Sequence, residues 1–589
     1  MNGLMESIGY ADWILHFLLF FPVAGMFAAL FAAEERAKNV AFGFALVELI
    51  VSLPLWWAVG ADVAGFQLTT AAEWIPAWGI GYIVGVDGIS VLLLLLTTLL
   101  TPLAVLGSYR YIQRRQRAFY AMMLLLETGM VGVFIALDLF LFYVFWELML
   151  VPMYFIIGIW GGDRRIYAAI KFFLYTAVGS LLMLVGILFL VWKLHAQTGQ
   201  ISFALADIMH VSLTWSEQAW LFGAFALAFA VKVPMFPVHT WLPDAHVEAP
   251  TPGSVILAAV LLKMGAYGFL RFLLPLFPEA ATSPLFVGIM LVLGVIGIVY
   301  AAWVAAVQPD AKKLIAYTSV AHMGFVVLGI FALTFEGIQG AMIVMLSHGA
   351  STGAMFLLLG MLYERRHTRR IADFGGLAAV MPMFATIFVL TALASIGLPG
   401  TSGFVGEFLA LIGTFQTHPW IALFATTGVI FAAYYMLPMV QRILFGPVDR
   451  DENRDLHDLT RRELAVLAPL VGLMIWMGVY PKPFLDRTSA SVQALIEHVE
   501  ARRLAGATRY TVAEPVRAQA PPANADFGAS GVGRQASESG SQVVDAFEPE
   551  TAGTPSLTPD ARRLTPRAEA GDPARATHLA ATRNPAGVR

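Results

Sequence analysis

The sequence predicts an all-α polytopic membrane protein with about 14 transmembrane helices. Of its 589 residues, 58% are hydrophobic and only 13% are charged, a balance typical of membrane proteins. Apolar runs of about 20 residues, the length that crosses a bilayer, recur along the chain. Lys and Arg gather in every second connection between these runs, which is the pattern that sets membrane topology.

The predicted membrane helices follow one another through short connections. Each is an apolar run of roughly 20 residues, apart from one longer stretch near the C-terminal third. They cover residues 14–33, 39–59, 86–109, 118–137, 139–160, 168–193, 218–234, 251–274, 284–307, 311–332, 338–362, 375–415, 419–444 and 463–481.

Basic residues predict the orientation of these helices. The connections after helices 1, 3, 5, 9, 11 and 13 carry Lys or Arg, whereas the alternate connections hold few, chiefly Lys193 and Arg271. By the positive-inside rule the basic side is cytoplasmic. Both termini are therefore predicted on the periplasmic, outer side of a bacterial inner membrane. The basic connections contain Arg36, Lys38, Arg110, Arg114, Arg115, Arg117, Arg164, Arg165, Lys171, Lys312, Lys313, Arg365, Arg366, Arg369, Arg370, Arg442, Arg450, Arg454, Arg461 and Arg462.

Two of the predicted helices are interrupted. Helix 7 contains Pro234 and Pro237, which lack backbone donors. Helix 12 is too long for one straight span, because Pro382 to Phe415 would extend roughly 50 Å against a hydrocarbon core of about 30 Å. The glycine-rich stretch 397–403 (GLPGTSG) lies in its middle. Helices 7 and 12 are five apart, which predicts two inverted five-helix repeats, helices 4–8 and 9–13, of the kind that builds transport sites.

This pattern divides the chain into five parts. Residues 1–117 hold helices 1–3, residues 118–274 form the first inverted repeat with one half-channel, and residues 284–444 form the second. Residues 445–500 hold the last transmembrane helix and its flanks. Residues 501–589 are rich in Ala, Pro, Arg, Ser and Gly with few aromatic residues, so we expect a disordered tail.

Several classes of site are excluded or disfavoured. The chain has no cysteine, so it holds no Cys-ligated iron–sulfur cluster and no disulfide. Residues 79–85 are glycine-rich but lack both the G-x-G-x-x-G spacing and an expected strand–turn–helix frame, which argues against a nucleotide site. No P-loop, nucleophile elbow, metalloprotease motif or other metal site is indicated, and nothing points to nucleic acid.

Two lysines stand inside apolar helices. Lys232 and Lys263 each occupy a position where an uncompensated charge costs about 2.5–3.5 kcal/mol on insertion scales. We interpret them as parts of a proton or ion path; the alternative is that they form structural ion pairs. Glu147, in an aromatic stretch of helix 5, lies roughly 12 Å deep, and Lys263 lies roughly 18 Å deep. We predict that Glu147 pairs with Lys232 in a contact that opens and closes, the alternative being a permanently closed pair.

Two histidines on consecutive helices extend this set. His322 and His348 are predicted to relay protons from Lys263 to Glu407, which follows the break in helix 12. They could instead ligate a haem iron or form hydrogen bonds in a polar core.

Three further ionisable residues have open interpretations. His239 and His246 flank the TWLPDA stretch, and they either line a proton path from the cytoplasmic side or cap and solvate the loop. Glu127, in helix 4, is a buried acid with no assigned role, or it faces a neighbouring subunit.

Four segments together carry a family resemblance. They are WELMLVPMYF around Glu147, FAVKVPMFPVHTWLPDAHVEAPTPGSVILAAVLLKMGAYG, AYTSVAHMGF, and GLPGTSGFVGEF around Glu407. They closely resemble the antiporter-like membrane subunits of respiratory complex I, NADH:quinone oxidoreductase. The resemblance covers about residues 10–485. The acid at position 407, where sister subunits commonly carry lysine, favours one branch of that family.

The resemblance implies a fourteen-helix, proton-translocating subunit of the membrane arm, driven by quinone reduction elsewhere in the complex. It implies antiporter-like neighbours on both sides, and NADH, FMN, iron–sulfur clusters and quinone in partner subunits, with no cofactor in this chain. Alternatives are a subunit of a multisubunit cation/proton antiporter, a subunit of an energy-converting membrane hydrogenase, or a structural spacer. By the resemblance, the proton-channel positions are Glu147, Lys232, Lys263 and Glu407, with His322 and His348 on a central polar axis.

Overall fold

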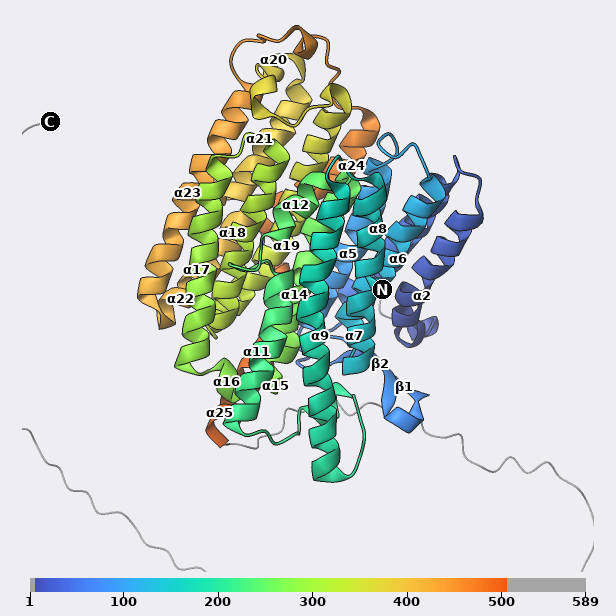
Figure 1. The fold of residues 1–589 in the computed structure, drawn as a ribbon, viewed down its shortest axis with the longest axis vertical. Coiled ribbons are helices and arrows are strands. Elements are labelled where there is room, and N and C mark those ends of the chain that lie inside the picture. Colours follow the sequence, from blue (N-terminus) through green and yellow to red (C-terminus); the bar gives the residue numbers. More distant parts are fainter. Residues whose placement is uncertain (1–5, 506–589) are drawn as a thin grey trace, which may run out of the picture. The chain divides into compact units, whose positions relative to one another are not determined.

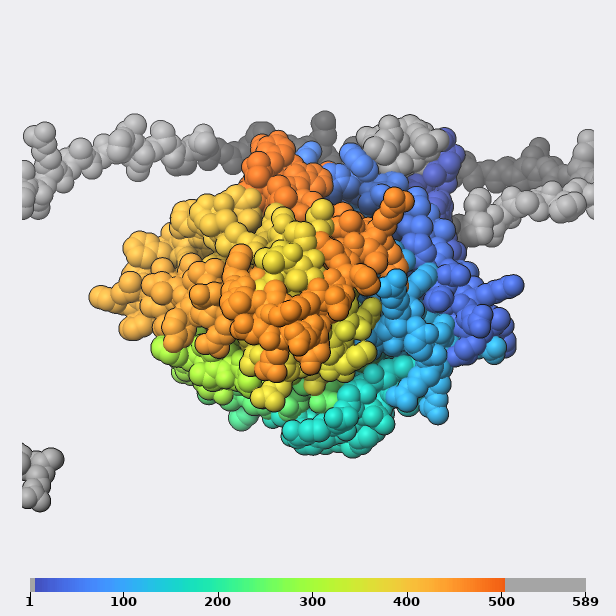
Figure 2. Space-filling model, turned by 90° about the horizontal axis from the view of Figure 1, so that it is seen from above, coloured from blue at the N-terminus to red at the C-terminus, as the bar shows by residue number. Residues whose placement is uncertain are grey.

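The computed structural model describes residues 6–505. This part of the chain is built almost entirely of helices, most of which stand side by side (Figure 1). Seen from above, the blue N-terminal segments lie at one edge, light-orange segments of the later half lie at the opposite edge, and darker orange segments adjoin the blue ones (Figure 2).

The N-terminal region combines helices with one hairpin. The strands β1 and β2 pair antiparallel, and Gly79 connects them with a φ of 66°, which glycine adopts without strain. The expectation that residues 79–85 lack a strand–turn–helix frame was wrong in one respect, because β2 is followed by α5 after Asp87 alone. A two-stranded antiparallel hairpin is nevertheless not the parallel βαβ unit that binds dinucleotides. The elements are α2 (Tyr10–Phe31), α3 (Ala37–Ser52), α4 (Leu55–Ala58), β1 (Gln67–Ile75), η1 (Pro76–Trp78), β2 (Ile80–Val86) and α5 (Gly88–Gly107).

The next segment contains the predicted helices 4–8, several of them in pieces. Helices α7 and α8 meet at Met149, because Pro152 has no N–H to donate to the turn before it. The elements are α6 (Gln116–Ile135), α7 (Leu139–Leu148), α8 (Leu150–Trp160), α9 (Arg165–Thr198), α10 (Leu205–Ile208), α11 (Trp215–Lys232), α12 (Trp241–Glu248), α13 (Thr251–Ile256), η2 (Leu257–Leu261), α14 (Leu262–Gly268), η3 (Phe269–Leu273), α15 (Leu274–Leu276) and α16 (Pro278–Ala281).

The remaining segment ends in a helix that the sequence did not predict. This helix, α25, runs past the boundary expected at residue 500; the tail from residue 506 onward lies outside the described residues. The elements are α17 (Pro284–Ala306), α18 (Ala311–Phe331), α19 (Phe335–Arg366), η4 (Ile371–Asp373), α20 (Leu377–Val380), α21 (Pro382–Ile396), α22 (Ser402–Thr417), α23 (Pro419–Leu444), η5 (Asp451–Asn453), α24 (Arg461–Val479) and α25 (Lys482–Ala505).

Both predicted helix interruptions are confirmed. Helix α11 ends at Lys232, just before Pro234, and the chain becomes helical again only at Trp241. Between α21 and α22, Gly397 and Gly400 have φ values of 83° and 91°, a region that side chains with a Cβ rarely adopt. The breaks therefore follow from the proline and glycine residues that predicted them.

The number of membrane crossings stays partly a prediction. Twelve helices in the described region are long and apolar enough to span a bilayer, so the chain is a multi-pass membrane protein. The two further predicted crossings are the interrupted ones, α11 with α12 and α21 with α22, whose pieces are shorter or less apolar. The total of 14 and the inverted repeats remain expectations.

Burial separates a core from a periphery. The apolar windows of Thr251–Leu276 and Phe335–Arg366 are 100% buried, whereas that of Pro419–Leu444 is 33% buried. The basic connections lie together at one end of the bundle, where Arg369 pairs with Asp310 at 3.3 Å and Arg365 pairs with Glu463 at 2.8 Å. The core helices carry Lys263 and His348, so the candidate site lies in the most enclosed part of the molecule.

Candidate functional site

Lys263 lies in the middle of the most enclosed helix. Its side chain is fully buried, and α14, which carries it, is flanked by the π-helical stretches η2 and η3. Such stretches rearrange backbone hydrogen bonds and are frequent at functional sites. The Lys263 Nζ donates to the Ala258 carbonyl at 2.5 Å and lies 2.6 Å from His348 Nδ1. These two partners offset the cost of burying the amine.

A second buried contact joins the next two predicted residues. His322 Nδ1 lies 2.9 Å from Glu407 Oε1, and both side chains are almost completely buried. The two histidine rings have centroids 5.6 Å apart at an angle of 63°. The structure thus brings together Lys263, His348, His322 and Glu407 in that order, from four different helices.

One gap remains in this line. The Nε2 atoms of His322 and His348 are buried and have no hydrogen-bond partner among the residues that the structure describes. Unsatisfied buried polar atoms are costly and usually bind water. Because both imidazole rings keep one free nitrogen, a proton can cross between them through a water molecule or by ring rotation.

Lys232 and Glu147 are arranged differently. Lys232 is buried, and its Nζ has no hydrogen-bond partner within residues 6–505. It lies over the rings of Trp146 and Phe172, 5.1 and 5.9 Å from their centroids. The Glu147 Oε1 atom also has no partner in the described region. No ion pair within 4.0 Å joins Lys232 to Glu147 there, so the predicted pair is open in this structure. That Glu147 and Lys232 close into a pair stays a prediction.

The two histidines of the connection around α12 are buried. His239 packs against the rings of Phe236 and Tyr300, with centroids 5.8 and 5.5 Å away. His246 is stacked on Phe356 at 4.6 Å, and neither of its ring nitrogens has a partner in the described part of the chain. Both side chains are shielded from solvent, so they do not lie at an exposed loop surface, and the interpretation that they cap and solvate the loop stays untested. Their role in a proton path remains a prediction.

Glu127 does not face a neighbouring subunit, as one interpretation had it. It is completely buried within the chain, next to Glu48 on α3, which is also completely buried. The Ser52 hydroxyl, one turn after Glu48, is 2.8 Å from the Thr98 hydroxyl. Glu48 was missed in the sequence analysis. The signal that identified Glu127, an acidic residue inside an apolar run, also marks Glu48.

The burial of two basic residues was also missed. Arg271 Nη2 pairs with Asp87 Oδ1 at 2.6 Å; Asp87 also caps α5 by accepting from the Ser90 N–H at 2.9 Å. Lys312 is 8% exposed and donates to the Ala249 carbonyl at 2.6 Å. Both basic residues stand near helix ends, where the sequence gives no sign of whether a charge is exposed or enclosed.

The described residues contain no group of three or more His, Cys, Asp or Glu side chains placed to hold a metal ion. The Nδ1 atoms of His322 and His348 are already engaged with Glu407 and Lys263. This geometry suits proton exchange between the side chains.

Comparison with known proteins assigns the family. The NADH:quinone oxidoreductase/Mrp antiporter transmembrane family matches residues 136–432, and the NADH-ubiquinone oxidoreductase chain 4 amino terminus matches residues 44–132. NADH-quinone oxidoreductase subunit M of Rhodobacter capsulatus is 49% identical over 488 residues, which cover 81% of this chain and 94% of that protein. The chain belongs to the NADH-quinone oxidoreductase subunit M (chain 4) family. The predicted resemblance is confirmed.

Solved structures agree with this membership. A chain of respiratory complex I from Thermus thermophilus has a TM-score of 0.75 and 33% identity, with 82% of this chain and 99% of that chain covered. A chain of the Mrp complex from Dietzia sp. has a TM-score of 0.72 but 21% identity, with 84% and 99% covered. At that identity the second match shows a shared fold and nothing more specific. In this chain, the shared fold holds the four-residue line described above.

Proposed function

We propose that this chain translocates protons across the membrane as a membrane-arm subunit of NADH:quinone oxidoreductase. The buried line from Lys263 through His348 and His322 to Glu407 carries this proposal. Each member exchanges a proton readily, and two of the three steps are direct contacts, Lys263 to His348 and His322 to Glu407. Glu147 and Lys232 supply the first half of the path, and an approach of their charges changes the proton affinity of Lys232.

The energy and the redox chemistry come from partner subunits. NADH, FMN, iron–sulfur clusters and quinone bind there, in keeping with a chain that contains no cysteine. Antiporter-like subunits adjoin this chain within the membrane arm. In a bacterial inner membrane the basic end faces the cytoplasm by the positive-inside rule, with both termini on the periplasmic side.

Cation/proton antiport is the alternative, because the Mrp chain shares the fold. Membership in an energy-converting membrane hydrogenase is a further alternative. Close identity to subunit M over nearly its whole length favours complex I over both.

The test is a substitution at the centre of the line. In the purified complex reconstituted into vesicles, Lys263→Met should reduce proton pumping roughly tenfold or more, since a positioned proton carrier contributes about 10²-fold or more to a transfer. Lys263→Arg retains the charge but not the ability to release a proton, so it should also fail. Normal pumping by a fully assembled Lys263→Met complex would contradict the proposal.

A further inference from the structure

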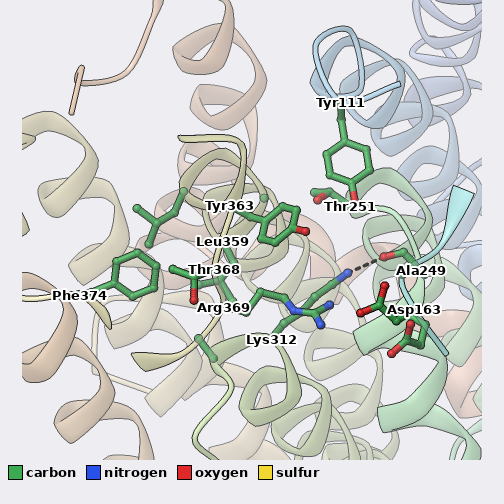
Figure 3. A pocket seen from close by; sticks show the side chains of 15 residues that line it. Tyr111, Asp163, Ala249, Thr251, Lys312, Leu359, Tyr363, Thr368, Arg369 and Phe374 are labelled. Carbon is green, nitrogen blue, oxygen red and sulfur yellow. Dashed lines mark hydrogen bonds between the residues drawn. The ribbon is translucent and has the colours of Figure 1, made fainter. Parts of the chain in front are cut away.

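Two hollows in the molecule differ in what lines them. The cavity at the basic end holds the Lys312 and Arg369 side chains, and the Lys312 Nζ donates to the Ala249 carbonyl there (Figure 3). A groove of about 280 Å³ has a lining of leucine, tryptophan, methionine and phenylalanine alone, which suits an apolar ligand. The residues of this apolar groove are Leu49, Leu53, Trp56, Trp57, Leu92, Leu95, Leu96, Leu99, Leu346, Leu473, Trp476, Met477 and Phe484.

The apolar groove lies at the end of the bundle away from the basic connections. Helices α3 and α24 both begin at the basic end, at Ala37 and Arg461, and reach the groove in their last turns. Trp57 and Trp476 in the groove are 50% and 48% exposed. Tryptophans exposed at one level of a membrane protein mark the boundary between hydrocarbon and headgroups. The groove therefore opens at the level where the acyl chains of a lipid begin.

Aromatic rings hold the mouth of the groove in shape. The ring centroids of Trp56 and Phe484 are 5.3 Å apart, and those of Trp476 and Phe484 are 4.9 Å apart. The Arg487 guanidinium lies over the Trp56 ring, 5.2 Å from its centroid, and donates to the Val59 carbonyl. A guanidinium has five N–H donors, so these contacts leave Arg487 able to bind an anionic group at the mouth.

Charges of both signs surround the mouth. Lys482 pairs with Asp486 at 2.6 Å, and both side chains are exposed; such a pair is weak and opens readily to a ligand. Asp62 and Asp486 both act electrostatically on Arg487. Two basic and two acidic groups match a zwitterionic headgroup, whose phosphate accepts from the basic side chains and whose primary amine donates to a carboxylate. An anionic lipid brings no cation of its own to meet these carboxylates.

We propose that the apolar groove is a specific binding site for one zwitterionic phospholipid with a primary-amine headgroup. One acyl chain lies in the groove between α3, α5 and α24. The phosphate contacts Arg487 and Lys482, and the amine contacts Asp486 or Asp62. The lipid joins α3, near the start of the chain, to α24 and α25 at the end of the described residues. This proposal goes beyond the proposed function and does not depend on it.

The first experiment identifies the occupant of the groove. A photoreactive benzophenone side chain is placed at Leu53, and the matched control carries it at Leu181 on α9, which is 56% exposed and does not line the groove. The assembled complex is reconstituted into vesicles of equal parts phosphatidylethanolamine and phosphatidylglycerol. Irradiation at position 53 should capture phosphatidylethanolamine roughly threefold above its share of the lipid, the size expected for one or two exposed charged contacts. Position 181 should show no such enrichment.

Two results of this experiment overturn the proposal. Capture of both lipids at position 53 in proportion to the vesicle composition means that only bulk lipid visits the groove. Capture of a peptide from a neighbouring subunit means that protein covers the groove. Neither result bears on proton pumping, so the proposed function stands or falls separately with Lys263→Met.

The second experiment reverses the headgroup preference. Asp62→Asn combined with Asp486→Asn leaves Lys482 and Arg487 without their carboxylates and makes the mouth cationic. The benzophenone at position 53 should then capture phosphatidylglycerol in excess. Unchanged capture of phosphatidylethanolamine overturns the headgroup assignment, because the charges at the mouth then do not select the lipid.

The third experiment fills the groove. Leu95→Trp places a larger side chain in its wall, so it should abolish the enrichment of phosphatidylethanolamine at position 53. Leu181→Trp, on a surface outside the groove, is the control and should preserve the enrichment. An enrichment that survives Leu95→Trp in the assembled complex places the acyl chain elsewhere and overturns the proposal.

Discussion

The two halves of the candidate path differ in how their members are held. In the later half, Lys263 contacts His348 at 2.6 Å and His322 contacts Glu407 at 2.9 Å. In the earlier half, the Lys232 ammonium has no hydrogen-bond partner among residues 6–505 and lies over two aromatic rings, at 5.1 and 5.9 Å. The later half is thus connected by polar contacts, whereas Lys232 and Glu147 in the earlier half do not pair with each other in this structure.

This difference indicates a division of labour. A line of close contacts passes protons without large movement, so the later half is suited to conduction. An amine without a polar partner in a low-dielectric site responds strongly to any charge that approaches it. We therefore propose that the earlier half acts as a switch, in which movement of Glu147 toward Lys232 would change which of the two holds a proton.

The largest expected effect is in the switching half. Glu147→Gln and Lys232→Ala should each lower proton pumping and coupled quinone reductase turnover by roughly tenfold or more, because each removes one of the two charges whose approach drives the switch. Pumping by reconstituted complex and assembly by native gel are measured together. Near-normal pumping in both assembled variants would leave a structural role alone.

The conducting half should tolerate a change of length better than a loss of charge. Glu407→Gln should impair pumping about as severely as Lys232→Ala, since an amide cannot accept the proton from His322. Glu407→Asp keeps an acid that is one methylene shorter, so it should retain part of the rate. The two variants are compared in vesicles under the same proton gradient. Equal activity of Gln and Asp at this position would argue against proton transfer there.

A combined variant tests whether the halves act in series. If they do, Lys232→Ala with Glu407→Gln should be little worse than either single change, because one block already stops the path. Fully multiplicative losses would indicate two independent routes. The measurement is pumping rate for the two single variants and the double variant, normalised to assembled complex.

The ionisable residues of the path were predictable because a charge in an apolar run is costly and therefore rarely accidental. The breaks at Pro234 and Gly397 followed from local backbone chemistry. The contacts between these residues were harder to predict from the sequence, because Lys263 and His348 are 85 residues apart in the chain. Nothing local signals the π-helical stretches around Lys263 or the enclosure of Lys312, because both depend on which helices pack beside them.

The smallest expected effect concerns the anchoring of the conducting half. His498, on α25, has its Nε2 3.3 Å from the carbonyl of Pro275, which lies on α15 at the end of the membrane span Thr251–Leu276 that includes Lys263. Burial lowers the pKa of His498 from 6.5 to about 4. His498 therefore binds a proton less readily when α25 is packed in place than when it is detached.

An unfolded or detached α25 takes up that proton below about pH 6.5, and the anchored one only near pH 4. The stabilising contribution of the buried, neutral His498 is therefore fully present above pH 6.5 and decreases progressively as the pH falls toward 4. The melting temperature of the complex should drop more steeply between pH 7 and pH 5 in the wild type than in His498→Gln, which does not titrate. The exposed His457, replaced by Gln, is the control and should change nothing. Identical pH slopes for wild type and His498→Gln would show that α25 contributes no pH-sensitive anchor to the conducting half.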